Sequence, residues 1–269
     1  MRLHIRFAAE LSTHDPTVAV FLIEAHPSNE ILQARLDWTP ETHTEPLPDV
    51  FGNVGGRLSL PGGDVQVEYE ATVTAPVQPL LPDTAGDPDP LLLPPETLLY
   101  TQPSRYCPSD RLELLASELF GQSRPGLARV QDICGWIYEH VRYQYGTSTV
   151  STSAFETVTE RVGVCRDFAH LAITFCRALN IPARYVSGYC LGLEQQDLHA
   201  YIEAYVGGQW LPFDATSAVP RPALVKIAAG LDAATCAWCT LYGGGVTNSM
   251  SVEVREELEE SDGCPSSAC

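Results

Sequence analysis

Along the first hundred residues, apolar positions recur at the spacing of β-strands. From residue 65 to residue 73 apolar and polar residues alternate, which is typical of a half-buried strand. Two shorter runs, Thr17–Ile23 and Leu58–Leu60, are β-branched or apolar, and glycine pairs such as Gly55-Gly56 and Gly62-Gly63 separate the runs. The pattern predicts an antiparallel, sandwich-like all-β domain over residues 1–95.

A proline-rich stretch ends this region. Nine prolines fall between residues 76 and 108, a density that neither a helix nor a central strand tolerates. We therefore place a domain boundary near residue 95. Asp83, Asp87 and Asp89 lie in this stretch, but the glycine and the distal glutamate of a calcium-binding loop are missing. The sequence favours a solvated acidic linker over a metal site.

Helical periodicity begins after the prolines. Apolar residues recur at spacings of three and four between residues 110 and 141, and two further helices are expected near Glu156 and over residues 165–179. Strand-like segments follow at residues 183–189, 200–206, 210–213 and 249–254. The second domain, residues 96–255, is predicted to pack helices on an antiparallel sheet, so the fold class is α+β. Residues 256–269 form an acidic tail.

Composition limits the possible partners and the cellular location. The chain has 269 residues and a formal net charge of −18, which argues against nucleic acid or an anionic membrane surface as a partner. Residues 1–6 lack the apolar core of a signal peptide, and no uninterrupted apolar run is long enough to span a membrane. Nine cysteines, an odd number, indicate reduced thiols in a cytoplasmic protein. The oligomeric state cannot be read from the sequence.

Cys165 is the most informative single position. It begins a helix that is apolar around most of its circumference, directly after Gly163-Val164. At the first turn of a helix, unpaired backbone N–H groups and the helix dipole stabilise an anion and offer donors to a nearby oxyanion. A nucleophilic thiol needs such a place. The alternative is a buried structural cysteine, which is the usual role of this residue type.

His199 and Asp214 are predicted to meet on one β-hairpin. Gly207-Gly208 is a two-residue turn signal, so Val206 faces Gln209 and paired residue numbers sum to 415. Asp214 then lies on the same face as His199, one diagonal step away and within reach of the imidazole. A carboxylate in that place fixes the tautomer of a histidine base. The alternative is a solvent-facing histidine and a turn aspartate, and a three-residue loop would break the register.

Four segments together resemble the bacterial transglutaminase-like superfamily, whose core is similar to that of papain. They are Gly163–Leu171, Arg177–Tyr189, His199–Tyr205 and Trp210–Thr216, and Asp49–Asn53 resembles the β-rich domain that accompanies this family. The resemblance implies that Cys165, His199 and Asp214 are the nucleophile, the base and the residue that orients the base. It also implies that the first half is a separate all-β module. No cofactor and no metal ligand is expected.

Two departures from the family pattern stand out. Where the family often carries Gly-Arg-Asp-Tyr, this chain has Gly230-Leu231-Asp232-Ala233, which puts any substrate contact at that stretch in doubt. Tyr201 stands where many members have tryptophan, which is a milder change.

Several other residues are of types that occur in metal, redox or catalytic sites. Cys236 and Cys239 form a CxxC pair, but a zinc site needs two more ligands and a redox site needs a βαβ unit. His170 lies about 140° around the helix from Cys165, so it is expected to be structural. Asp167 lies in the first turn, where capping the helix is at least as good an explanation as catalysis. The Cys165 N–H is one expected oxyanion donor, and the second is expected from Tyr143, Tyr145 or the Ser/Thr-rich loop that follows them.

The functional expectation is a cysteine-dependent amide-bond hydrolase that forms an acyl-enzyme and acts on a peptide or protein substrate. Transfer of the acyl group to an amine, as in a transglutaminase, is the first alternative. A binding or scaffold protein that keeps the fold without turnover is the second, and a thiol–metal or redox protein built on Cys236 and Cys239 is the third.

Overall fold

The N-terminal half builds two four-stranded antiparallel sheets, as the computed structural model shows for residues 1–75, 86–217 and 223–257, the parts of the chain that it describes. The first sheet has the order β14-β1-β6-β3, and its strands are Gly245–Glu257, Arg2–Thr13, Gly63–Thr74 and Glu30–Thr39. The second has the order β13-β2-β5-β4, with strands Cys239–Leu241, Thr17–Phe21, Val54–Leu60 and Glu45–Pro48.

Alternating burial packs these two sheets face to face. Every second side chain of β1 and β6 is buried while its neighbours are exposed, so one face of the sheet is covered. The rings of Phe21 on β2 and Trp38 on β3 lie 5.0 Å apart between the two sheets. The sandwich-like architecture predicted for this half is therefore confirmed.

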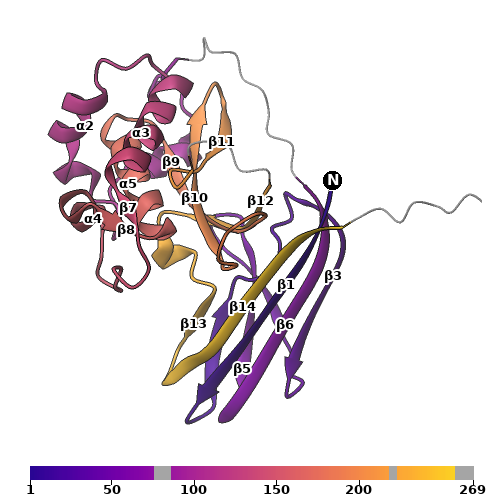
Figure 1. Ribbon diagram of the computed structural model, residues 1–269. Helices are drawn as coiled ribbons and strands as arrows, with labels where there is room; N and C mark the ends of the chain where they lie inside the picture. The colour runs from indigo at the N-terminus through magenta and orange to yellow at the C-terminus, as the bar shows by residue number, and fades with distance from the viewer. Residues whose placement is uncertain (76–85, 218–222, 258–269) are drawn as a thin grey trace, which may run out of the picture.

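The last strand returns to the first sheet. β14 runs antiparallel to β1 over its whole length, from Arg2 opposite Glu257 to Thr13 opposite Gly245 (Figure 1). The prediction that residues 249–254 belong to the sheet of the second half is therefore wrong. Val252 and Val254 give this strand one apolar face, but such alternation does not specify which sheet the strand joins. Glu256 and Glu257, assigned to the acidic tail, end β14, and residues 258–269 lie outside the described part.

The second half packs helices on one sheet of order β11-β10-β9-β12. Its strands are Gln209–Phe213, His199–Val206, Ala183–Cys190 and Leu224–Gly230. The helices are α1 (Pro95–Leu98), α2 (Glu113–Phe120), α3 (Leu127–His140), α4 (Ala154–Glu160) and α5 (Cys165–Ala178), and two short strands, β7 (Arg142–Tyr143) and β8 (Val162–Gly163), pair in parallel. This confirms the α+β class.

Helix α5 is the centre of this half. It packs against β9 and β10 on one side and against α2, α3 and α4 on the other, so almost every residue from Asp167 to Arg177 is buried. Figure 1 shows the helices gathered on the side of the sheet away from the sandwich. The buried helix predicted at residues 165–179 is confirmed, and only its first residues, Cys165 and Arg166, and its C-terminal end are partly exposed.

The proline-rich stretch lies only partly within the described residues. Pro76, Pro79, Pro82 and Asp83 fall in the range 76–85, which the structure does not describe. Asp87 differs from the solvated linker residue that was expected, because it accepts hydrogen bonds from the Gly126 N–H and the Arg129 guanidinium at the start of α3.

Asn53 joins the sandwich to the second half. Its side chain is fully buried and pairs with Ala229 of β12 as a neighbouring strand would: Nδ2 donates to the Ala229 carbonyl at 2.8 Å, and Oδ1 accepts from the Ala229 N–H at 2.8 Å. Asp49 orients the amide by accepting from the Asn53 backbone N–H and from Nδ2. The Asp49–Asn53 segment therefore closes the outer edge of β12 with side-chain hydrogen bonds.

No helix within the described ranges is both long enough and apolar enough to cross a membrane. The cellular location stays a prediction.

We expect Asn53→Ala to destabilise the protein by about 2–4 kcal/mol, because it leaves the buried Ala229 N–H and carbonyl without partners. Urea unfolding followed by tryptophan fluorescence measures this change. Ser59→Ala, at an exposed position of β5 in the same sandwich, is the control and should cost less than about 0.5 kcal/mol. An unchanged unfolding midpoint for Asn53→Ala would show that the hydrogen bonds between Asn53 and Ala229 do not contribute to stability.

Candidate active site

A buried aspartate in the first turn fixes the N-terminus of α5. Asp167 is inaccessible to solvent; its Oδ2 accepts from the Val164 N–H at 2.9 Å and its Oδ1 from the Ser148 hydroxyl at 2.9 Å. A Cβ at Gly163 would lie 2.7 Å from the Cβ of Asp167, so only glycine fits there. Asp167 thus caps the helix, as its position predicted, and it also ties the Ser/Thr-rich loop to the turn that presents Cys165.

The hairpin β10–β11 has the predicted register. Val206 faces Gln209 and Glu203 faces Pro212, and Gly207 and Gly208 both have positive φ angles, of 61° and 82°. Such a turn matches the twist of the strands and is easily formed only by glycine-like residues. The register sets Asp214, the residue after β11, beside His199 at the start of β10.

His199 and Asp214 form a buried hydrogen-bonded pair. Nε2 of His199 lies 2.7 Å from Oδ2 of Asp214, and their side chains are only 3% and 4% exposed. The other carboxylate oxygen, Oδ1, accepts from the backbone N–H and the hydroxyl of Thr216 at 2.9 and 2.7 Å. Both oxygens of the buried carboxylate are therefore satisfied, and the orientation of the carboxylate is fixed.

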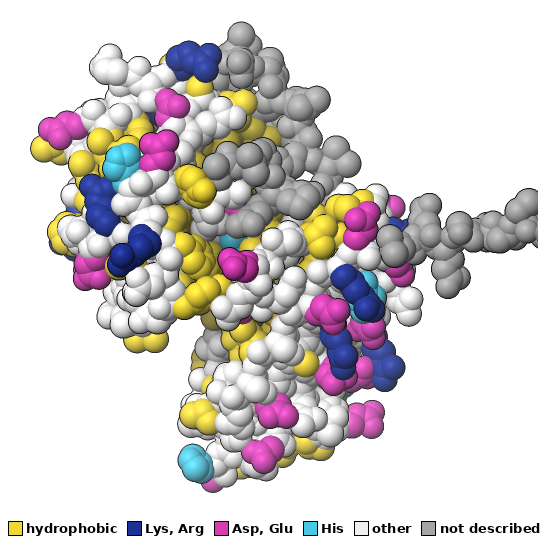
Figure 2. Space-filling model, viewed as in Figure 1, with side chains coloured by type: hydrophobic (Ala, Val, Ile, Leu, Met, Phe, Trp, Pro, Cys, Tyr) yellow, Lys and Arg dark blue, Asp and Glu magenta, His cyan; other side chains and the backbone are white. Residues whose placement is uncertain are grey.

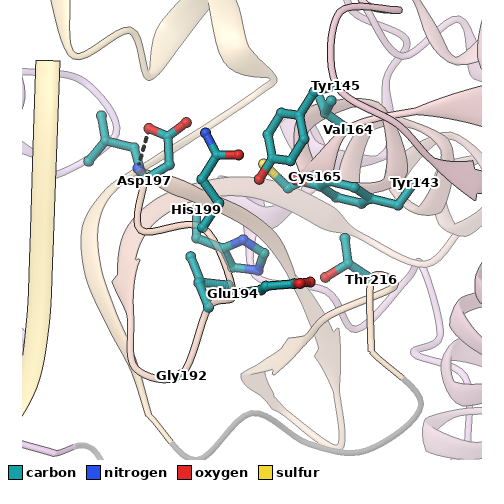
Figure 3. A pocket seen from close by; sticks show the side chains of 12 residues that line it. Tyr143, Tyr145, Val164, Cys165, Gly192, Glu194, Asp197, His199 and Thr216 are labelled. Atoms are coloured by element: carbon teal, nitrogen blue, oxygen red, sulfur yellow. Dashed lines mark hydrogen bonds between the residues drawn. The ribbon is translucent and has the colours of Figure 1, made fainter.

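Cys165 lies on the other side of the imidazole. The thiol raises the pKa of His199, and because Nε2 faces Asp214, the nitrogen directed at sulfur is Nδ1 (Figure 3). The structure thus brings together the three residues that the sequence singled out, two from the hairpin and one from the helix N-terminus.

The local environment favours a protonated imidazole beside an ionised carboxylate. Burial lowers the pKa of His199, but hydrogen bonds to Asp214 and Cys165 and the charges of both groups outweigh it and raise the pKa to about 9. Burial raises the pKa of Asp214, yet the hydrogen bonds and charge of His199, with the Thr216 donors, hold it well below its usual value. The pair is therefore an ion pair at neutral pH.

The thiol and the imidazole open onto a cleft of about 740 Å³. Helix α5 and the segment before it contribute Tyr143, Tyr145, Val164 and Cys165, and the opposite wall is the β9–β10 loop, residues 191–198, with Thr216 nearby. Figure 3 shows the two tyrosine rings beside the sulfur atom. On the face seen in Figure 2, apolar side chains border a hollow between the helices and the sandwich.

Tyr143, one of the expected oxyanion-hole residues, lines the cleft beside the thiol. Burial raises the pKa of its phenol, the neighbouring Cys165 and Tyr145 side chains raise it further, and a hydrogen bond with the Cys165 backbone opposes them. Of the Ser/Thr-rich loop, Ser148 is already engaged with Asp167.

His170 has the structural role expected of it. It is fully buried, accepts a hydrogen bond from the Ala233 N–H at Nε2 (3.2 Å) and stacks on Tyr106 with ring centroids 5.0 Å apart. Burial lowers its pKa well below the usual value. His170 therefore holds the segment around Ala233 and does not line the cleft.

The Gly230–Ala233 stretch, which departs from the family pattern, also has a structural role. Asp232 accepts from the Tyr106 N–H at 3.0 Å and the Ala234 N–H at 2.9 Å, and the Leu231 carbonyl accepts from the buried Arg177 guanidinium. None of these residues is among those that line the cleft within the described chain.

The CxxC pair carries no metal cluster within residues that the structure describes. Cys236 and Cys239 are both free thiols, and no group of three or more His, Cys, Asp or Glu side chains is placed to hold a metal ion there. Burial raises the pKa of Cys239 to about 11 and leaves Cys236 protonated as well. Cys264 and Cys269 lie outside the described ranges.

The sequence analysis missed the β9–β10 loop. Glu194 and Asp197 from this loop line the cleft, as do the loop residues Gly192, Leu193, Gln195 and Leu198. No periodic pattern marks a loop as a cleft wall. The usable signal was that Asp197 precedes His199 by only two residues and lies at the same end of the strand.

The scan of family profiles matches residues 114–215 to a family described as the transglutaminase-like superfamily. The crystal structure of a "Putative Cysteine Protease" from Cytophaga hutchinsonii superposes on this chain with a TM-score of 0.87 at 38% identity; the match covers 95% of this chain and 90% of that one.

Two uncharacterized mycobacterial proteins are similar over shorter segments. A protein of Mycobacterium leprae is 31% identical over 117 residues, which make up 40% of this chain and 42% of that protein. One of Mycobacterium tuberculosis is 40% identical over 81 residues, or 30% of this chain and 26% of that protein. The match thus spans less than half the length of either relative.

We expect the imidazole of His199 to titrate near pH 9 in the folded protein. NMR of ring-labelled histidine measures this, and Asp214→Ala should lower the value because it removes the main group that favours the imidazolium. Since the folded pKa exceeds the unfolded value of about 6.5, the stability that this group contributes is complete below pH ~6.5 and is lost as the pH rises through 9. A His199 pKa near 6.5 in both proteins would contradict the ion pair.

Proposed function

Because the chain belongs to the transglutaminase-like superfamily, we propose that it is a cysteine-dependent amide-bond hydrolase, a peptidase or amidase acting on a peptide or protein. In this proposal Cys165 is the nucleophile, His199 moves the protons and Asp214 orients His199. The Cytophaga hutchinsonii protein, described as a "Putative Cysteine Protease", supports the same type of chemistry.

One observation carries the proposal: His199 is hydrogen-bonded to Asp214 and has the Cys165 sulfur beside its other ring nitrogen, and the thiol and the imidazole both line an open cleft. An imidazole with a pKa near 9 holds its proton at neutral pH and is therefore available as an acid beside the sulfur atom. A structural cysteine in an apolar core would have neither a basic partner nor a cleft beside it.

The first half of the reaction makes a thioester. The Cys165 sulfur attacks the carbonyl carbon of the amide, a C–S bond forms, and the π electrons move to oxygen. The Cys165 N–H and the Tyr143 hydroxyl are the proposed donors to that oxyanion. When the intermediate collapses, the C–N bond breaks, and the proton on Nδ1 of His199 passes to the leaving amine. A free amine and an acyl-enzyme remain.

The second half consumes water. Nδ1, now unprotonated, takes a proton from a water molecule as that water attacks the thioester carbonyl carbon. The C–S bond breaks, the acid is released, and the thiolate and imidazolium are restored. Asp214 stays ionised throughout, and its hydrogen bond to Nε2 keeps Nδ1 directed at the reacting atoms.

The cleft lining supports hydrolysis over acyl transfer to an amine. Transfer requires the acyl-enzyme to be shielded from water, and Tyr143 and Tyr145 are the aromatic residues among the described residues that line this cleft. Trp38, Trp136, Trp210 and Trp238 are all placed elsewhere. The opposite wall carries the polar side chains of Glu194, Gln195 and Asp197 instead, which water solvates readily.

We expect Cys165→Ala and His199→Ala each to lower the rate of hydrolysis of an internally quenched peptide library about 10³-fold or more. Iodoacetamide labelling gives an independent reading. In the wild-type protein the labelling rate of Cys165 should change little between pH 8 and pH 6, because the imidazolium keeps the thiolate paired. In His199→Ala it should fall steeply over the same range.

Cys134→Ala, at a buried thiol on α3 that takes no part in the cleft, is the matched control and should retain activity. Absence of hydrolysis by a folded wild-type protein, with Cys165 labelling that is insensitive to His199→Ala, would refute the enzyme proposal and favour the scaffold alternative.

Acyl transfer is tested by offering dansylcadaverine together with a glutamine-rich protein such as casein. We expect peptide bonds or amides to be hydrolysed without incorporation of the amine, because water has free access to the thioester. Amine incorporation that exceeds hydrolysis and disappears in Cys165→Ala would make the protein a transferase.

A further inference from the structure

We infer that the cleft binds substrates that carry a positively charged group, an ammonium or guanidinium, close to the reacting carbonyl. This inference rests on the proposed function, since it concerns the substrate class of the same site. The charge is recognised by Glu194 and Asp197 of the β9–β10 loop.

The two carboxylates flank the catalytic histidine. In Figure 3, Asp197 and Glu194 lie on opposite sides of His199, and both line the same cleft as the Cys165 thiol. The charge of the His199 ring lowers the pKa of Asp197, so the two side chains are close enough to interact electrostatically. A substrate with its carbonyl at the sulfur therefore passes between or beside two acidic side chains.

The positive charge of His199 in this cleft is already paired with Asp214. Among the described residues that line it there is no lysine or arginine, and within the described part of the chain neither carboxylate has an ion-pair partner. By contrast, the buried Glu203 of β10 is paired with both Arg184 and Lys226. The protein neutralises a carboxylate where it serves the fold and leaves two unneutralised where substrate enters.

The partial burial of the Asp197 carboxylate costs free energy, and a bound cation would reduce that cost. It is about half buried, and burial raises its pKa, which the hydrogen bond from the adjacent Leu198 N–H at 2.7 Å and the charge of His199 only oppose. A carboxylate removed from water without a countercharge is destabilised. A bound ammonium or guanidinium would supply that countercharge and at the same time exclude an acidic side chain from the place.

The loop that carries the carboxylates is anchored to the sandwich. Between Glu194 and Asp197, the Gln196 side chain accepts a hydrogen bond from the Val254 N–H of β14 at 3.1 Å. The β9–β10 loop is thus tied at its middle as well as at both strand ends. This anchoring keeps the two charges near the thiol before substrate arrives, which favours recognition by a fixed electrostatic site.

The charge preference is measured first without any substrate. The Cys165 thiol is alkylated with 2-bromoethylammonium, iodoacetamide and iodoacetate, and each rate is divided by that for a small neutral thiol. Glu194→Gln and Asp197→Asn should each lower the ratio of cation to anion rates by about two- to fivefold, and the effect should shrink in high salt. Both substitutions keep the size of the side chain.

Glu68→Gln, which removes one negative charge from the exposed face of the sandwich, is the matched control and should leave the ratio unchanged. A uniform effect of all three substitutions would show only that net charge matters, and would overturn the inference. So would a ratio that neither loop substitution changes.

The second measurement uses quenched peptides that differ at one position next to the cleaved bond. Lysine or arginine should give kcat/KM at least about tenfold above glutamate, and the gap should close in the double variant Glu194→Gln/Asp197→Asn. Peptides with a free or an acetylated N-terminus separate recognition of a side chain from recognition of an α-amino group.

The two proposals fail separately. Hydrolysis without a charge preference would overturn the inference while the hydrolase stands. A charge-dependent labelling ratio that responds to both substitutions, without turnover of any peptide, would support cation recognition and overturn the hydrolase.

Discussion

An imidazolium and a carboxylate removed from water, His199 and Asp214, set the main constraint on this structure. Burying either charge alone is costly, so the pair persists only while each ion has its partner and every remaining lone pair has a donor. Thr216 and Cys165 supply those contacts. They come from separate elements, so the turn at Gly207-Gly208, the cap on α5 and the packing of α5 on the sheet must all be in place together.

The sandwich acts on this centre through the sheet beneath it. Asn53 completes the outer edge of β12, Tyr189 of β9 donates to the Ile23 carbonyl at 2.6 Å, and Gln196 ties the β9–β10 loop to β14. An exposed edge strand would otherwise be free to shift its register or pair with another chain. The all-β module thereby supports β9, β12 and the β9–β10 loop of the sheet that carries His199. None of its own residues is among the described ones that line the cleft.

Local physics explains which features the sequence could predict. Helix α5 and the hairpin were recoverable because an apolar run after glycine and a Gly-Gly turn specify their own geometry. The alternation of apolar and polar residues in β1, which buries Leu3, Ile5 and Phe7, is likewise typical of a half-buried strand. The sequence could not predict where β14 lies, because its pairing with β1 is set by distant residues. It could not predict the acidic β9–β10 loop either, because residues that line a cleft follow no periodic pattern.

The pairing of β14 with β1 also affects how the protein is made. The strand that pairs with β1 on its outer side is more than two hundred positions further along the chain, and closing so long a loop is slow. On the ribosome, the segment from α2 to β12 emerges while the first sheet still lacks one of its strands. The anchor for Gln196 arrives with that last strand, so the acidic wall acquires its final support only as synthesis reaches β14.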